Sequence, residues 1–228
     1  MTTQDDGKGV FGITVEDLRR TAKPKNPSAG GERDDYSGPF DPHLDVERDL
    51  SKTAHIQLWK VATKMYLNID AAWRGAVETK FGQEASLELS RKVWFEVPNN
   101  GCFVESTLPR LAMNISGTTV EDWMKHLQID PGLMGIAGVS CHMEDENTGV
   151  LTVNRCDILD ALEQAGDETV QKHVCEELEW VGLQAGVDHM NRNIKVTPLK
   201  LPKFGCRDGG CVCQWQFKLQ PPGSEGAS

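Results

Sequence analysis

Seven cysteines are the residues of this sequence that offer the widest choice of chemistry. As thiolates they could bind a metal ion, attack a substrate or exchange with a disulfide. The first fifteen residues contain neither the basic nor the apolar segment of a secretory leader, so we expect a reducing, cytoplasmic location. An odd number of cysteines there argues against a disulfide framework. The thiols are therefore expected in the core, in a metal site or in a reactive site.

Three of these cysteines, distant in the sequence, could meet if the predicted helices lie on the predicted sheet. Cys156 and Cys175 each directly precede a predicted helix, and Cys213 lies on the last predicted strand. Because the N-terminal end of a helix favours an anion, we expect the first two thiols to be acidified, against the repulsion of nearby acidic residues. Three thiolates suit an iron–sulfur cluster or, as second choice, zinc, with Cys206 or Cys211 as a candidate fourth ligand.

Two other interpretations of the cysteines stay open. The spacing of Cys206, Cys211 and Cys213 is not that of a zinc ribbon, and cysteine is among the most buried residue types, so core packing alone would also explain them. Alternatively, Cys175 acts as a nucleophile and His173, two residues earlier, acts as its general base. His173 could equally join the cysteines as a metal ligand.

An aspartate stands among aromatic residues in the first long predicted helix. Trp59, Tyr66, Asp70 and Trp73 recur at helical spacing, so they form a stripe along this helix. Desolvation by the rings would raise the pKa of Asp70, which suits a general base or the anchor of a pocket. The alternative is an ordinary ion pair with Arg74, one turn along. Arg74 could also bind a small carboxylate substrate.

The helix that carries Asp70 is predicted to begin after Ser51, its cap, and to continue without Pro or Gly to residue 74. An aliphatic stripe at helical spacing is predicted to pack inward; it comprises Leu58, Ala62, Met65, Ile69, Ala72 and Ala76. Further helices are predicted at residues 83–94, 119–127, 157–165 and 176–190.

The second half of the chain alternates in hydrophobicity, which is typical of strands. A hairpin is predicted at residues 139–143 and 150–154, followed by strands at 194–201 and 211–219. In the last strand, one face is predicted to be buried: Cys211, Cys213, Trp215, Phe217 and Leu219. The predicted fold class is α+β, with an N-terminal helical half followed by an antiparallel sheet of about four strands that carries two helices.

Composition indicates one domain with flanking segments. We predict an extended or disordered arm at residues 1–50, a single α+β domain at 51–220 and a disordered tail at 221–228. The formal charge of −10 argues against a nucleic-acid partner. No apolar run reaches the roughly 18 residues of a membrane-spanning helix, so no membrane partner is expected.

Four segments carry a resemblance to a known family: DLSKTAHIQLWKVATKMYLNIDAAWRGAVETKFGQEASLELSRKVW, RCDILDALEQAG, HVCEELEW and CVCQWQF. Over roughly residues 49 to 219 the chain resembles the L-2-amino-thiazoline-4-carboxylic acid hydrolase-like proteins and their uncharacterised prokaryotic relatives. It is similar, more distantly, to the vinyl-reductase-like small-molecule-binding domains. The resemblance matches Asp70 and Trp73 to a recurrent Asp and Trp of the family. It also matches Cys156, Cys175 and Cys213 to a dispersed set of cysteines.

Our first functional hypothesis is a cytoplasmic enzyme of hydrolase or lyase type with a small-molecule substrate. The three dispersed cysteines would hold an iron–sulfur cluster or zinc with one open coordination position, which acts as a Lewis acid. Asp70 would move the proton, and Trp59, Tyr66 and Trp73 would wall the pocket.

Two rival hypotheses remain. The first is a non-catalytic domain that binds a small molecule or senses redox state or metal. The second is a homo-oligomer held together by the N-terminal arm.

Overall fold

In the computed structural model of the chain, the described residues are 32–34, 36, 40–96, 101–166, 168–203 and 212–221. Most of the predicted arm and residues 222–228 of the predicted tail lie outside the described residues. Cys206 and Cys211 do so as well. At the described end of the arm, the Arg33 N–H donates to the Asp49 carbonyl oxygen over 2.7 Å, and Arg33 forms a parallel bridge with Leu50.

Helices fill the first half of the described chain: α2 Val46–Asp49, α3 Lys52–Phe81, α4 Gln83–Arg91, the π-helical turn η1 Lys92–Glu96, α5 Cys102–Ala112, α6 Val120–Ile129 and α7 Pro131–Met134. A hairpin of β1 Ala137–Asp145 and β2 Thr148–Cys156 follows. Then come α8 Asp157–Ala165, α9 Glu168–Lys172, the π-helical turn η2 His173–Leu178, α10 Glu179–Asp188, β3 Ile194–Lys200 and β4 Cys213–Leu219. The predicted α+β fold class is confirmed.

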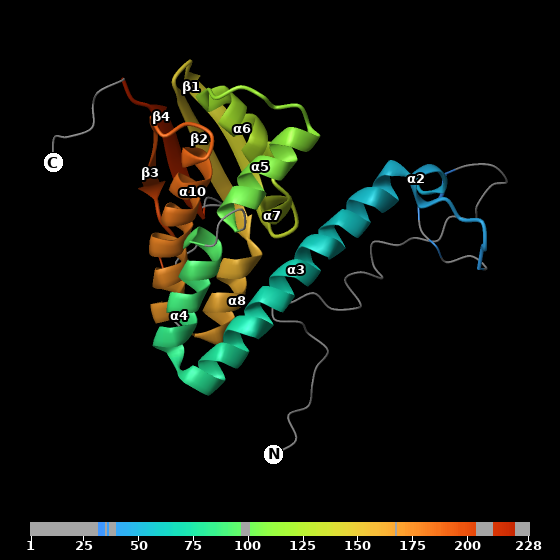
Figure 1. Cartoon of the computed structure of the whole chain (residues 1–228), viewed down its shortest axis with the longest axis horizontal. Coiled ribbons are helices and arrows are strands. Elements are labelled where there is room, and N and C mark those ends of the chain that lie inside the picture. The colour runs from blue at the N-terminus through green and yellow to red at the C-terminus, as the bar shows by residue number, and fades with distance from the viewer. Residues whose placement is uncertain are drawn as a thin grey trace.

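The four strands form one antiparallel sheet in the order β1-β2-β4-β3, and helices α6 and α10 cover one of its faces (Figure 1). Trp215 and Phe217 of β4 are buried against this layer, as their alternation predicts. On the opposite face of the sheet, the Gln214 amide donates to the Thr152 hydroxyl over 3.0 Å. The hydrophobic core therefore lies between the sheet and the helices.

The edge strand β3 is protected by side chains of α10. The Gln184 amide nitrogen donates to the Ile194 carbonyl oxygen over 3.0 Å, and its oxygen accepts from the Val196 N–H over 2.9 Å. The Trp180 indole donates to the Val196 carbonyl oxygen over 3.0 Å. These bonds occupy backbone groups that an edge strand would otherwise offer to another chain.

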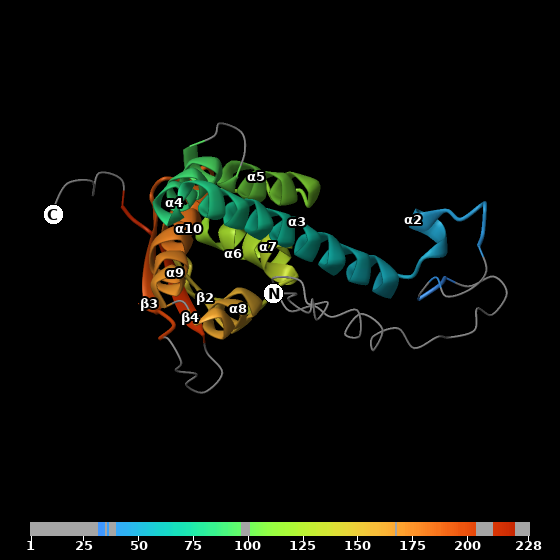
Figure 2. The same cartoon turned by 90° about the horizontal axis from the view of Figure 1, so that it is seen from below.

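Helix α3 extends well beyond the sheet and its covering helices, and α2 lies at its far end (Figures 1 and 2). Ser51 caps it as predicted, since its hydroxyl accepts from the Ala54 N–H over 3.2 Å. The prediction that its aliphatic stripe packs inward is wrong, because all six residues of that stripe are exposed. Thr63 and Leu67 face the body instead: the buried Thr63 hydroxyl donates to the Pro131 carbonyl oxygen over 2.9 Å, and Leu67 packs against the core. Two adjacent apolar stripes give the same helical period, so periodicity could not choose between them.

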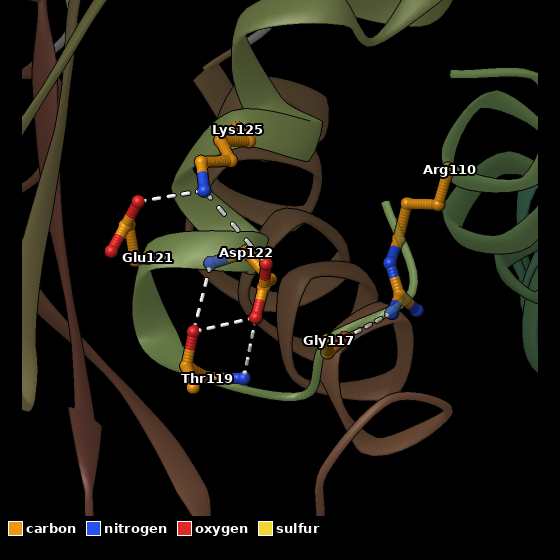
Figure 3. Close-up of polar contacts among 6 residues, drawn as sticks. All are labelled: Arg110, Gly117, Thr119, Glu121, Asp122 and Lys125. Carbon is orange, nitrogen blue, oxygen red and sulfur yellow. Dashed lines mark hydrogen bonds and ion pairs between the residues drawn. The ribbon is translucent and has the colours of Figure 1, made fainter. Parts of the chain in front are cut away.

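Helix α6 begins with a capping box (Figure 3). The Thr119 hydroxyl accepts from the Asp122 N–H over 3.2 Å, and the Asp122 carboxylate accepts from the Thr119 N–H over 3.1 Å. The Thr119 hydroxyl and backbone hydrogen bonds hold the pKa of Asp122 below its usual value. Nearby, Arg110 at the end of α5 donates to the Gly117 carbonyl oxygen over 2.7 Å. These bonds set where the helix next to the sheet begins.

Two helical segments differ from their predictions. Helix α5 was not predicted; it carries Pro109 in its interior, a residue that normally breaks a helix. The helix predicted to begin at residue 176 starts earlier, since helical turns run from Glu168 to Asp188. Cys175 therefore lies inside a π-helical turn and does not precede a helix. Among the described residues, no helix combines the length and apolar character needed to cross a membrane.

Candidate active site

A cavity of about 470 Å³ lies between α3, η1, α5 and α7. Three of the residues predicted for the pocket line it: Trp59, Tyr66 and Asp70. The other described lining residues are Ala62, Thr63, Val93, Trp94, Gly101, Val104, Glu105, Leu108, Pro109, Pro131 and Gly132. Trp73 is not among them and is 73% exposed, and Arg74 does not line the cavity either. The volume is that of a small-molecule site.

Glu105 of α5 supplies a carboxyl group that the sequence analysis did not identify. The Tyr66 hydroxyl donates to Glu105 Oε1 over 3.4 Å. A side chain built on Gly132 would come within 3.4 Å of the same oxygen, so the carboxyl group points towards the start of α7. Burial, and then the negative charges of Asp130 and Glu179, raise the pKa of Glu105 to about 8. A group with this pKa can give or take a proton near neutral pH.

Asp70 is the second carboxyl group of the cavity. Its burial raises its pKa, and the positive charge of Arg74 opposes this rise. The pKa of Tyr66 is raised as well, mainly by burial and then by the negative charges of Glu105 and Asp70. Its side chain therefore stays a neutral phenol that can donate a hydrogen bond. The predicted rise in the pKa of Asp70 is confirmed, whereas no ion pair between Asp70 and Arg74 is found in the described part of the chain.

Val93 and Trp94 of the π-helical turn η1, together with Gly101, form another wall of the cavity. The Tyr66 and Trp94 rings meet edge to face, with centroids 6.2 Å apart. Gly101 has φ +54°, and a Cβ there would collide with the Trp94 backbone. π-helical turns are rare and occur frequently at functional sites. Here the turn brings Trp94 against the helix that carries Asp70.

A second layer of hydrogen bonds fixes the α7 side of the cavity. Asp130 caps α7, since its Oδ1 accepts from the Gly132 N–H over 2.7 Å and from the Leu133 N–H over 3.2 Å. The buried His126 lies with Nε2 3.4 Å from Asp130 Oδ2. The pair of His126 and Asp130 therefore holds the backbone at the start of α7, beside which the Glu105 carboxyl group lies.

The predicted cysteine site lies apart from the described lining of this cavity. Cys156 ends β2, and its sulfur accepts from the Leu159 N–H over 3.4 Å as the cap of α8. The Trp215 indole donates to the Cys213 sulfur over 3.4 Å. Burial raises the pKa of Cys175, and the neighbouring Cys156, Glu179 and Cys213 raise it further. Cys156 and Cys213 thus lie close enough to Cys175 to act on its pKa.

The predicted acidification of the two helix-end thiols is wrong. Burial raises the pKa of Cys156 to about 11, although hydrogen bonds from the start of α8 oppose the rise. The pKa of Cys175 is raised too. Desolvation therefore outweighs the helix end, which acts only over the first turn.

No group of three or more His, Cys, Asp or Glu side chains that could hold a metal ion is found within the described part of the chain. Cys206 and Cys211, the candidate fourth ligands, lie outside it.

His173 lies two residues before Cys175 in the sequence, but the hydrogen bond of its ring joins it to Glu177. Its Nδ1 lies 2.8 Å from Glu177 Oε2, one turn along the π-helical segment. Its Nε2 is buried and has no hydrogen-bond partner among the described residues. The pairing of His173 with Cys175 as base and nucleophile stays a prediction, and neither residue lines the described cavity.

Comparison with known proteins gave no match: no family model, no curated protein and no solved structure resembles the chain significantly. The resemblance to the L-2-amino-thiazoline-4-carboxylic acid hydrolase-like proteins therefore stays a prediction.

Proposed function

We propose that the chain is a small-molecule enzyme of hydrolase or lyase type that works by acid–base catalysis in the cavity between α3 and α5. Glu105 acts as the proton donor and Asp70 as the proton acceptor. One observation carries the proposal: two carboxyl groups whose pKa values are raised share a small cavity whose other walls are mainly apolar and aromatic.

The two carboxyl groups have different surroundings, which separates their roles. A pKa of about 8 keeps Glu105 mostly protonated at pH 7, so it can protonate a leaving group. Burial raises the pKa of Asp70 against the opposing charge of Arg74, so its carboxylate is a stronger base than an ordinary Asp and can accept a proton. Tyr66 donates to Glu105 Oε1 and orients it. Trp59 and Trp94 line the cavity beside the reacting groups.

The cysteine-held metal is a separate part of the hypothesis. The described thiols of Cys156, Cys175 and Cys213 do not form a ligand set by themselves, so no catalytic step is assigned to an iron–sulfur cluster or zinc. Metal analysis and absorbance of protein purified without oxygen test this part independently. Bound iron with absorption near ~400 nm would support a cluster, because thiolate-ligated iron is coloured.

The acid–base proposal is tested with the variants Glu105→Gln and Asp70→Asn. The first assay follows consumption of L-2-amino-thiazoline-4-carboxylate, the compound that the family resemblance names, beside a panel of small amides, esters and amines. Each variant is expected to lower kcat by about 10²-fold or more on any compound that the wild type turns over. The wild-type rate should fall as the pH rises above about 8, because Glu105 then loses its proton.

Glu88→Gln on α4 is the matched control, since this carboxyl group is exposed and outside the cavity. It should leave kcat unchanged. Wild-type activity retained in both cavity variants would refute the acid–base roles. Binding of compounds without turnover of any of them would favour the rival hypothesis of a non-catalytic binding domain.

A further inference from the structure

The cavity has an unusual balance of side chains. Its described lining contains two carboxyl groups, Asp70 and Glu105, and three aromatic rings, Trp59, Tyr66 and Trp94. No Lys, Arg or His belongs to this described lining. The remaining described lining residues carry no charged side chain. The cavity thus offers negative charge and aromatic faces without a positive side chain of its own.

We propose that this cavity selects a small organic cation, an amine or quaternary ammonium group carried on an apolar body. The inference rests on the proposed function, because it names the substrate class of the same cavity. It goes beyond that function in assigning a charge to the ligand, which acid–base catalysis alone does not require.

Electrostatics and aromatic chemistry both favour a cation here. Asp70 on α3 and Glu105 on α5 approach the cavity from two different helices, so a positive group between them would interact with the Asp70 carboxylate and, once Glu105 ionises, with both. The faces of Trp59 and Trp94 can contact alkylated ammonium groups. Removing such a group from water costs less free energy than removing a bare metal ion. An anion would meet like charge in this cavity and would be repelled.

The charge of the whole chain acts in the same direction. Its formal charge is −10, with 34 acidic against 24 basic side chains. Such an excess raises the local concentration of cations and disfavours anions. The cavity and the overall field therefore select the same ligand charge.

Cation binding should strengthen with pH through the ionisation of Glu105. Burial raises the pKa of this group to about 8, so it stays mostly protonated below that pH. A bound cation favours its ionised form. Affinity for a permanently charged ligand should therefore rise between pH 6 and pH 9. The titratable or charged groups that act on Glu105 and Asp70 are Asp130, Glu179, Tyr66, Arg74 and Cys102.

The test compares two probes that differ in charge and little in shape. Choline carries a quaternary nitrogen, and 3,3-dimethylbutan-1-ol has carbon in the same place. Binding to the full-length protein is measured at pH 7 and pH 9 by calorimetry and by tryptophan fluorescence, since two tryptophans line the cavity. Choline is expected to bind at least about tenfold more tightly than the neutral alcohol, which corresponds to ~1.4 kcal/mol.

Variants assign the effect to the cavity. Asp70→Asn should weaken choline binding about tenfold and leave the alcohol unaffected, because it removes charge while it keeps the shape. Glu105→Gln should abolish the gain in choline affinity between pH 7 and pH 9. Glu88→Gln on α4 is the control, and circular dichroism verifies that each variant is folded.

The outcomes separate this inference from the proposed function. Equal or tighter binding of the alcohol overturns cation selection, as does choline binding too weak to detect at about 10 mM. If Asp70→Asn and Glu105→Gln still abolish turnover, the enzyme proposal survives that result. If both variants keep full turnover while choline binds selectively, the enzyme proposal falls and cation binding stands.

Discussion

The buried carboxyl group of Glu105 should make the protein less stable as the pH rises. An unfolded Glu ionises near its ordinary pKa of 4.5, whereas the folded-state pKa of Glu105 is about 8. Below pH 4.5 both states keep the proton and the group has no effect. Between these two values the unfolded state loses its proton first, so the free energy of unfolding falls as the pH increases. Above about pH 8 the loss is complete.

The size of the effect follows from the two pKa values. Moving the pKa from 4.5 to about 8 corresponds to about 5 kcal/mol, at ~1.4 kcal/mol for each tenfold change in the protonation equilibrium. The cavity is open to water and Glu105 is only half-buried, so solvent screening lowers the expected value to about 2 kcal/mol. Glu105→Gln keeps the shape of the side chain and removes the ionisation.

Urea unfolding of the wild type and of Glu105→Gln between pH 5 and pH 9 measures this effect. The difference between their free energies of unfolding cancels the titration of most other groups. The variant should gain about 2 kcal/mol on the wild type over this range. The exposed Glu88→Gln variant should show no such gain. A difference that stays constant within about 0.5 kcal/mol from pH 5 to pH 9 would refute the assignment of a raised pKa to Glu105.

Two further predictions concern the elements around the site. Thr119→Ala removes the capping box of α6 and should lower the free energy of unfolding by about 1 kcal/mol in urea titrations, whereas Thr118→Ala should have little effect. Gly101→Ala should destabilise the protein by about 1–3 kcal/mol, because φ is +54° there and the new Cβ would collide with the Trp94 backbone. Its melting temperature should fall, and an unchanged melting temperature would contradict the described turn.

Local patterns were sufficient for most elements. The Ser51 cap, the hairpin and the buried alternation of Trp215 and Phe217 were all predicted and are confirmed. Gly166, predicted to end a helix, adopts φ +72° at the C-terminus of α8. These features depend on residues within a few positions of one another, so the sequence contains the relevant information.

The candidate site was predicted in part. Trp59, Tyr66 and Asp70 share a helical stripe, and the structure brings them to one cavity. Glu105 could not be identified from the sequence. It lies on a helix that the sequence does not predict, because Pro109 argues against a helix there, and no spacing relates it to Asp70. Its raised pKa arises from burial and from acidic residues distant in the sequence. Such an environment exists only after the helices have packed.

The α+β class, the order of most elements and the spacing of side chains along each of them follow from local sequence patterns. Tertiary packing selected which stripe of α3 faces inward, with Thr63 buried and Met65 exposed. It likewise decided that burial outweighs the helix end at Cys156, so that its thiol is not acidified. The physical reason is common to both. Helical period and helix-end charge are local properties, whereas desolvation depends on every neighbouring chain segment.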